Sequence, residues 1–262
     1  QQACKANRKS IDAHLRLAEV LIEQEELEKA RREIDYASSL DPTNWKVTWY
    51  GARYSEAKGF LRDAADQYGE LLAELPGELP PQQALARVYA AMNQHQRALD
   101  LFKGILKAEP GNTDAIMGSA RTLLKQHNWL EAVNMLRGVN EATARYVEAQ
   151  LLLCDIYLNH AANLQAQHVD IALDALQALS GRTEDPRYYL ARGDIYRLLW
   201  QLARKRQLPN GKVIPDVRNN TPRNLGKIAE QSYQHYLRTV PRTAHREAIV
   251  RKKLEVAPWR LL

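Results

Sequence analysis

The sequence predicts an all-α fold, a right-handed superhelical solenoid of about six helix pairs with a capping helix at its C-terminal end. Three observations support this prediction. Prolines recur at Pro42, Pro76 and Pro110, a step of 34 residues. Small residues keep the same step in two columns, which are Ala30, Ala64, Ala98 and Ala132, and Ala18, Ala52, Ala86, Ala120 and Cys154. Bulky apolar residues follow the first column at a fixed distance, at Ile34, Tyr68, Phe102 and Leu136.

Each of these columns has a physical role in a pair of antiparallel helices. Where two helices cross closely, only a small side chain lets their backbones approach, and bulky neighbours fill the flanks. The proline ends the second helix, because the residue before it is pushed out of the α region. A period of 34 residues with this arrangement is the tetratricopeptide pattern.

The period divides the chain into repeats. We expect a linker or ragged start over 1–10, a tetratricopeptide domain over 11–242, and a capping helix and tail over 243–262, since solenoid ends need a polar lid. The six repeats of the domain are 11–44, 45–78, 79–112, 113–146, 147–186 and 187–242. The stretch "NHAANLQAQH" (159–168) of repeat five holds an insertion of about six residues, since its second helix restarts that far beyond the register. Repeat six holds a long loop between 204 and 224, which includes "LPNGKVIPDVRNNTPRN".

Charge is distributed unevenly along the chain. The net charge is +6, from 37 Lys and Arg against 31 Asp and Glu. Residues 1–201 carry 23 against 27, which gives −4, and residues 202–262 carry 14 against 4, which gives +10. A basic tail can bind nucleic acid. Stacking aromatics would support that function, but Tyr233 and Tyr236 occupy core positions and leave only Trp259, so the sequence argues against a nucleic-acid partner.

The composition also bears on the compartment. The longest apolar runs fall far short of the roughly 18 residues of a membrane-spanning helix, so we expect no membrane insertion. Two cysteines make no disulfide framework: Cys154 stands at a buried small-residue position and Cys4 lies in the ragged start. We therefore expect a cytoplasmic protein. The chain begins at Gln1 without an initiator methionine, and we expect it to be a piece of something larger.

The sequence shows no pattern of catalytic residues. It contains no glycine-rich phosphate loop, nucleophile elbow or kinase signature. His160 and His168 share the repeat-five insertion without neighbouring cysteines or a carboxylate set, which is typical of a surface loop rather than a metal site. We expect a chain that binds partners, is not itself an enzyme, and carries no metal or cofactor.

A partner would contact the first helix of each repeat, because these helices line the concave face of such a solenoid. The residues that face this side are Lys46, Trp49, Arg53, Gln83, Arg87, Met117, Arg121, Leu124 and Lys125. All of them except Gln83 and Leu124 form our candidate partner-binding groove. Arg53, Arg87 and Arg121 occupy the same position in three successive repeats, and guanidinium groups bind carboxylates in a bidentate manner. One hypothesis is that this column binds an acidic segment.

The alternative is that these arginines serve the domain itself. They would then pair with Glu56 or with acids of the second helices, or remain solvated, as surface charges commonly do. The usual chaperone-tail carboxylate clamp, with lysines and asparagines at set positions, is not matched here.

Three segments carry a more specific resemblance. They are Trp49-Tyr50, the junction "LPGELPPQQALA" and the stretch "VPRTAHR". With their surroundings they resemble the C-terminal tetratricopeptide domain of bacterial serine/threonine protein kinases of the mycobacterial protein kinase G type. In that family a rubredoxin-like metal module and a kinase domain precede the repeats, and the kinase phosphorylates a forkhead-associated regulator of central metabolism.

The resemblance implies a regulatory and scaffolding role for this chain. Its partners would be its own kinase domain, a substrate or an upstream regulator, and it could form a homodimer. The parent would be a kinase that uses ATP and magnesium, but neither the kinase nor the metal module lies in this chain. The competing hypothesis is a free-standing cytoplasmic adaptor that binds an acidic peptide segment.

Overall fold

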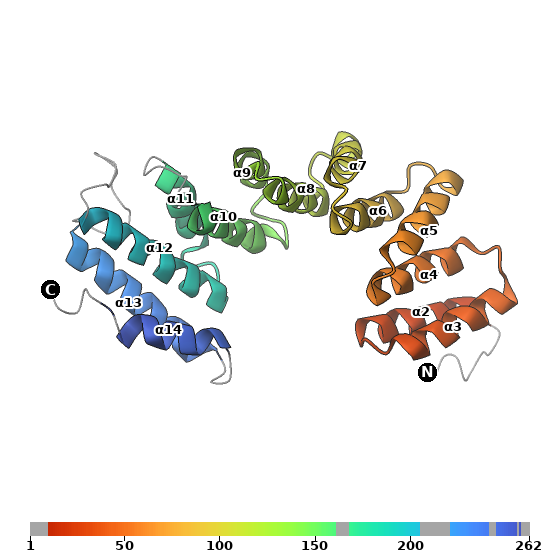
Figure 1. Cartoon of the computed structure of the whole chain (residues 1–262), viewed down its shortest axis with the longest axis horizontal. Coiled ribbons are helices and arrows are strands. Elements are labelled where there is room, and N and C mark those ends of the chain that lie inside the picture. The colour runs from red at the N-terminus through yellow and green to blue at the C-terminus, as the bar shows by residue number, and fades with distance from the viewer. Residues whose placement is uncertain (1–9, 161–167, 205–220, 241–244, 256, 258–262) are drawn as a thin grey trace. The chain divides into compact units, whose positions relative to one another are not determined.

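A computed structural model describes residues 10–160, 168–204, 221–240, 245–255 and 257. These residues form thirteen helices, and there is no strand among them. The chain divides into two units, Gln1–Ala132 and Val133–Leu262. The prediction of an all-α tetratricopeptide solenoid is confirmed (Figure 1).

The first unit consists of regular helix pairs. Its helices are α2 (Ile11–Glu23), α3 (Leu27–Leu40), α4 (Trp45–Lys58), α5 (Leu61–Glu74), α6 (Leu79–Ala91), α7 (His95–Ala108) and α8 (Thr113–Lys125). Helix α9 (Trp129–Arg137) carries the chain from the first unit into the second. The first helices of the four pairs begin at residues 11, 45, 79 and 113, which are the first residues of the expected repeats.

Helix ends in the first unit follow from local chemistry. Ser10 caps α2, Asn44 caps α4 and Asn112 caps α8, each with a side-chain oxygen that accepts a hydrogen bond from a backbone N–H of the first turn. The second helices α3, α5 and α7 end two residues before Pro42, Pro76 and Pro110. The prolines therefore stop the helices as the sequence predicts.

The small-residue columns form the crossings between helices. All eight alanines of the two columns and Cys154 have no exposed surface. The bulky residues that accompany them are also buried, with 5% of Ile34, 3% of Phe102 and none of Tyr68 or Leu136 exposed. Because apolar burial contributes about 25 cal/mol per Å², these repeated contacts are the main source of stability.

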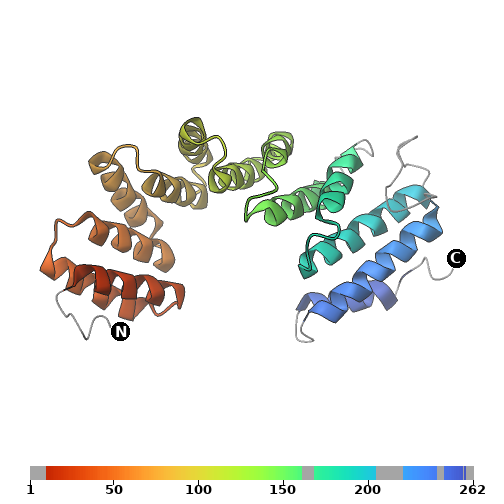
Figure 2. The ribbon, with the colours of Figure 1, turned by 180° about the vertical axis from the view of Figure 1, so that it is seen from behind.

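The second unit keeps the helix-pair plan but varies it. Its helices are α10 (Tyr146–His160), α11 (Val169–Leu179), α12 (Pro186–Arg204), α13 (Pro222–Thr239) and α14 (His245–Glu255). Helices α12 and α13 have 19 and 18 residues, against 13 or 14 for the helices of the first four repeats up to α8. Helix α14 packs on α13 and buries Val250 and Leu254, so a capping helix is present (Figure 2).

The structure corrects the edges of both expected loops. Asn159 and His160 are the last residues of α10, and Arg204 is the last residue of α12. Residues 222–224 belong to α13, because Pro222 fits the first turn of a helix and the Thr221 hydroxyl accepts from the N–H of Asn224 at 3.4 Å. Cys4, Trp259 and the middle of both loops lie outside the described residues. In the part of the chain that the structure describes, no helix is long and apolar enough to span a membrane.

Candidate functional site

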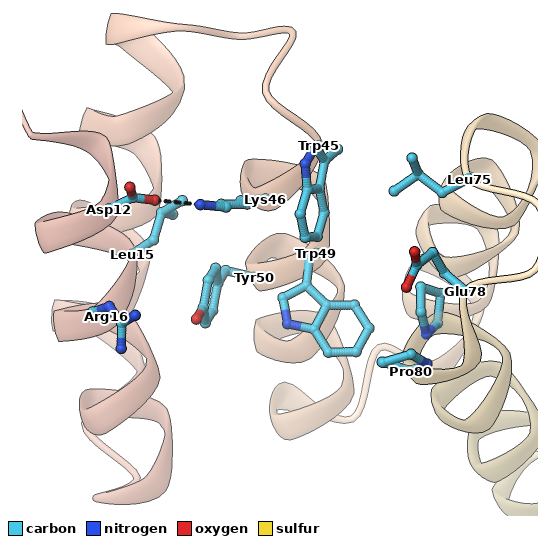
Figure 3. A pocket seen from close by; sticks show the side chains of 11 residues that line it. Asp12, Leu15, Arg16, Trp45, Lys46, Trp49, Tyr50, Leu75, Glu78 and Pro80 are labelled. Atoms are coloured by element: carbon cyan, nitrogen blue, oxygen red, sulfur yellow. Dashed lines mark hydrogen bonds and ion pairs between the residues drawn. The ribbon is translucent and has the colours of Figure 1, made fainter.

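A groove of about 590 Å³ opens in the first unit beside helix α4 (Figure 3). Helix α2 forms one wall, α4 lies in the middle, and the turn from α5 into α6 forms the other wall. The lining residues are Asp12, Leu15, Arg16, Trp45, Lys46, Trp49, Tyr50, Leu75, Glu78, Pro80 and Pro81. Of the candidate groove residues, the structure thus brings Lys46 and Trp49 together in one recess.

Ion pairing holds the side of the groove between α2 and α4. The Lys46 ammonium lies 2.7 Å from Asp12, which occupies the same position in the preceding repeat. The hydrogen bond and the charge of Lys46 hold the pKa of the Asp12 carboxyl below its usual value. The Lys46 ammonium is also 6.0 Å from the centroid of the Trp45 ring, within the range of a cation–π contact. Lys46 therefore already has an acidic and an aromatic partner.

Aromatic packing fixes the middle of the groove. The Trp49 ring meets the ring of Tyr68, a residue of α5, edge to face at 5.5 Å between centroids. Tyr68 is fully buried and donates a hydrogen bond from its hydroxyl to Glu56 at 3.1 Å. Such contacts hold Trp49 in one orientation, with part of its indole exposed to the groove. By contrast, Trp45 is 43% exposed.

Arg53 and Arg87 pair with carboxylates of the domain itself. Arg53 forms an ion pair with Glu19, which also accepts a hydrogen bond from Tyr50 at 3.2 Å. The Arg87 guanidinium donates to both oxygens of Glu56, at 2.9 and 3.1 Å. An acidic partner would have to compete with these carboxylates for both guanidinium groups.

The other candidate residues lie apart from this groove. Met117 is only 1% exposed, so its side chain packs in the interior, and the expectation that it lines a binding surface does not hold. Arg121 is exposed on α8. The Lys125 ammonium donates to the carbonyl of Ala90 at 3.4 Å, and Gln83 donates to Asn112 at 3.0 Å.

Sequence reasoning missed most of the groove lining. The wall opposite α4 comes from Leu75 and Glu78, which lie in the junction between repeats, and from Pro80, the second residue of α6 and the counterpart of Lys46 one repeat later. A usable signal was present in the charges: Asp12 and Lys46 have opposite charge at one repeat position, as do Glu19 and Arg53. Opposite charges one repeat apart predict ion pairs between neighbouring first helices.

The described residues contain no metal-ligand cluster, and their one cysteine is buried. Among them, no group of three or more His, Cys, Asp or Glu side chains could hold a metal ion. Burial raises the pKa of the Cys154 thiol, and this side chain has no exposed surface, so it is an inert packing residue.

Comparison with solved structures supports the same fold. A tetratricopeptide repeat protein from Parabacteroides merdae matches 94% of this chain and 98% of its own, with a TM-score of 0.55 and 15% identity. A thermophilic tetratricopeptide repeat protein of Thermus thermophilus matches 70% of this chain and 98% of its own, with a TM-score of 0.54 and 19% identity. The human IFIT1 dimer matches with a TM-score of 0.61 and 16% identity, over 90% of this chain and 57% of that one.

The comparison with protein families is more specific. The family model described as the protein kinase G tetratricopeptide repeat matches residues 1–259. Tetratricopeptide solenoids form extended protein-binding surfaces from stacked helices. The chain belongs to the protein kinase G tetratricopeptide repeat family.

Proposed function

We propose that this chain is the non-catalytic docking and regulatory domain of a serine/threonine protein kinase. In this proposal, the groove beside α4 binds a segment of the kinase domain, of a substrate or of an upstream regulator. The parent kinase would use ATP and magnesium, and the whole would work in the cytoplasm. This chain would contribute protein–protein contacts only, without a cofactor of its own.

One observation carries the proposal. The groove is lined by residues of two segments on which the resemblance to the kinase family rests: Trp49 and Tyr50 from α4, and Leu75, Glu78 and Pro80 from the junction before α6. The repeat pattern needs small residues at its crossings and bulky ones beside them, but it does not require the exposed part of the Trp49 indole or the exposed Pro80 ring in the groove. A partner that contacts these exposed surfaces would explain them.

The acidic-segment hypothesis has less support at this place. Glu19 and Glu56 already neutralise Arg53 and Arg87, and the groove itself contains the carboxylates of Asp12 and Glu78. A free-standing adaptor for acidic peptides would need a surface with more unpaired positive charge.

A binding experiment tests the proposal. The chain is immobilised and the kinase domain of a protein kinase G family member is passed over it, with the wild-type chain compared with Trp45→Ser. Trp45 is exposed, so the substitution should leave the fold intact. We expect about tenfold weaker binding, as for loss of an aromatic interface anchor. The matched control is Phe60→Ser, which removes an aromatic residue of similar exposure, 52%, outside the groove lining.

Two results would contradict the proposal. Equal binding by wild type and Trp45→Ser would show that the groove does not bind the kinase domain. A start codon at the position of Gln1 in the gene, with no kinase sequence joined to it, would favour the free-standing adaptor.

A further inference from the structure

Glu78 occupies the helix-capping position of its repeat but does not act as a cap. The equivalent residues one repeat earlier and later are Asn44 and Asn112, and both accept backbone hydrogen bonds at the start of their helices, at 3.1 and 3.0 Å. A capping side chain binds the N–H of the second or third residue of the helix. In α6 these residues are Pro80 and Pro81, which have no N–H.

The two prolines therefore leave the Glu78 carboxylate without its local donors. Its side chain makes no capping bond, and among the described residues no hydrogen bond or ion pair of this carboxylate is found. The residue is exposed and lines the groove. A carboxylate with no ion-pair partner among the described residues thus lies at one end of the recess.

Apolar side chains line the groove together with this carboxylate. Figure 3 shows Glu78 facing Trp45 and Trp49 across the groove, with Leu75 on one side and Pro80 on the other. Aromatic faces attract cations, because the face of the ring carries negative electrostatic potential. Two indoles with an aliphatic side chain and a proline also suit the methylene stem of a long basic side chain.

The lysine and the arginine that line the groove lie on its other side, and the Lys46 ammonium also reaches the Trp45 ring, at 6.0 Å from the ring centroid. The Lys46 ammonium pairs with Asp12 and lies on the side of α4 that faces α2 (Figure 3). Arg16 projects from α2, with Tyr50 and α4 between it and Glu78. The end of the groove near Glu78 is therefore electrically negative and apolar at once.

We propose that this end of the groove binds a lysine or arginine side chain of the partner segment, with the charged head at Glu78 and the stem between the indoles and Pro80. The inference rests on the proposed function for its partner, and it adds the chemistry of the residue that the partner inserts. A carboxylate of the same segment could pair with Arg16 on α2, but the basic residue is the one that anchors the segment.

Tryptophan NMR signals can test this directly on the full chain. The chain contains five tryptophans, and the indole N–H signals of Trp45 and Trp49 are assigned from Trp45→Phe and Trp49→Phe variants. The chain is titrated with N-acetylarginine methylamide and, separately, with the citrulline compound, which has nearly the same shape without the charge. We expect both indole signals to shift with arginine, and about fivefold weaker binding of citrulline, from loss of the cation–π and ion-pair contacts.

Variants at two glutamates supply the decisive comparison. Glu78→Gln should lower the affinity for the arginine compound to that for citrulline, with unchanged circular dichroism. Glu74→Gln, an equivalent change at an exposed residue outside the groove lining, should leave the titration unaltered. Absence of any shift at Trp45 and Trp49, equal binding of arginine and citrulline, or an unaffected Glu78→Gln variant would each overturn the inference.

A third compound separates this inference from its alternatives. If N-acetylglutamate methylamide bound more tightly than the arginine compound, the groove would be a site for acidic residues instead. Because these titrations contain no kinase domain, their outcome does not depend on the parent protein. Failure of arginine to bind would leave the docking proposal standing with another anchor, and failure of the kinase domain to bind would leave the basic-residue site intact.

Discussion

Two helix crossings, one in each unit, place a large aromatic ring against a glycine, but the ring is held differently in each. At Gly118 in α8, an added Cβ atom would overlap the ring of Phe102, and at Gly193 in α12 it would lie 2.5 Å from Cε1 of Tyr233. In both places a large aromatic ring lies where a side chain would otherwise be. Glycine is needed at each crossing because any Cβ atom would meet this ring.

The difference lies in what holds the ring. Phe102 has only apolar neighbours in its cluster, among them Ala98 and Ile105. The Tyr233 hydroxyl donates to Asp194 at 2.6 Å, and Lys253 of α14 pairs with the same carboxylate while its ammonium lies 5.6 Å from the Tyr233 ring. The crossing at Gly118 is thus packed by apolar side chains, whereas at Gly193 a polar network joins α12, α13 and α14.

Replacing Gly193 by alanine should cause the largest loss of stability and is the strongest test of this difference. The network holds the Tyr233 ring in place, so it cannot move away from the new methyl group, and we expect about 3 kcal/mol of destabilisation from overpacking. Gly118→Ala should cost less, about 1 to 2 kcal/mol, because the Phe102 side chain has no hydroxyl that a hydrogen bond could hold in place. Urea denaturation and amide exchange in α12 and α8 measure the two effects. Equal costs would mean that the polar network does not hold the ring.

Tyr233→Phe should make the second crossing resemble the first. Burial, followed by the charge of Asp194, raises the pKa of the Tyr233 hydroxyl, so it remains a donor at any ordinary pH. Its removal should cost about 1 to 2 kcal/mol in the free energy of unfolding measured by urea denaturation, since Asp194 keeps Lys253 as a partner.

The double variant sharpens this test. In the Tyr233→Phe background, Gly193→Ala should cost less than in the wild type, because the ring can now move; the two residues are in contact and are not expected to be additive. Strict additivity in a double-mutant cycle would show that the hydroxyl does not restrain the ring.

The sequence predicts the regular part of the fold well because one period repeats the same physics. Each alanine column, each bulky partner and each terminating proline appears several times, so errors at one position are corrected by the others. The turns between the two helices of each pair are harder to predict from the sequence. Glu25, Gly59, Asn93 and His127 share one repeat position and all have positive φ, yet only one of them is glycine. The turn is imposed by the packed helices on either side rather than by the residue in it.

The candidate groove was only partly predictable for a related reason. Position within a repeat indicates which side a residue faces, and this placed Lys46 and Trp49 at the surface of a groove. It does not indicate what the side chain meets there. Met117 is buried, and Arg87 binds Glu56 across 31 residues, as the more conservative interpretation of the arginine column expects. Glu78 was missed because its importance depends on the missing N–H groups of two prolines that follow it.

The smallest expected change in the free energy of unfolding is a stabilisation, and it separates the effect of crowding from that of helix propensity. Gly69 lies inside α5, and an added Cβ would meet nothing within 4 Å, in contrast to Gly118 and Gly193. Gly69→Ala should therefore stabilise the chain by about 0.5 to 1 kcal/mol, because alanine loses less backbone entropy in a helix. A raised urea midpoint with an unchanged slope would support this explanation. If Gly69→Ala destabilised the chain as Gly118→Ala should, the cost at the crossings could not be assigned to the aromatic rings, and the contrast between the two units would lose its physical basis.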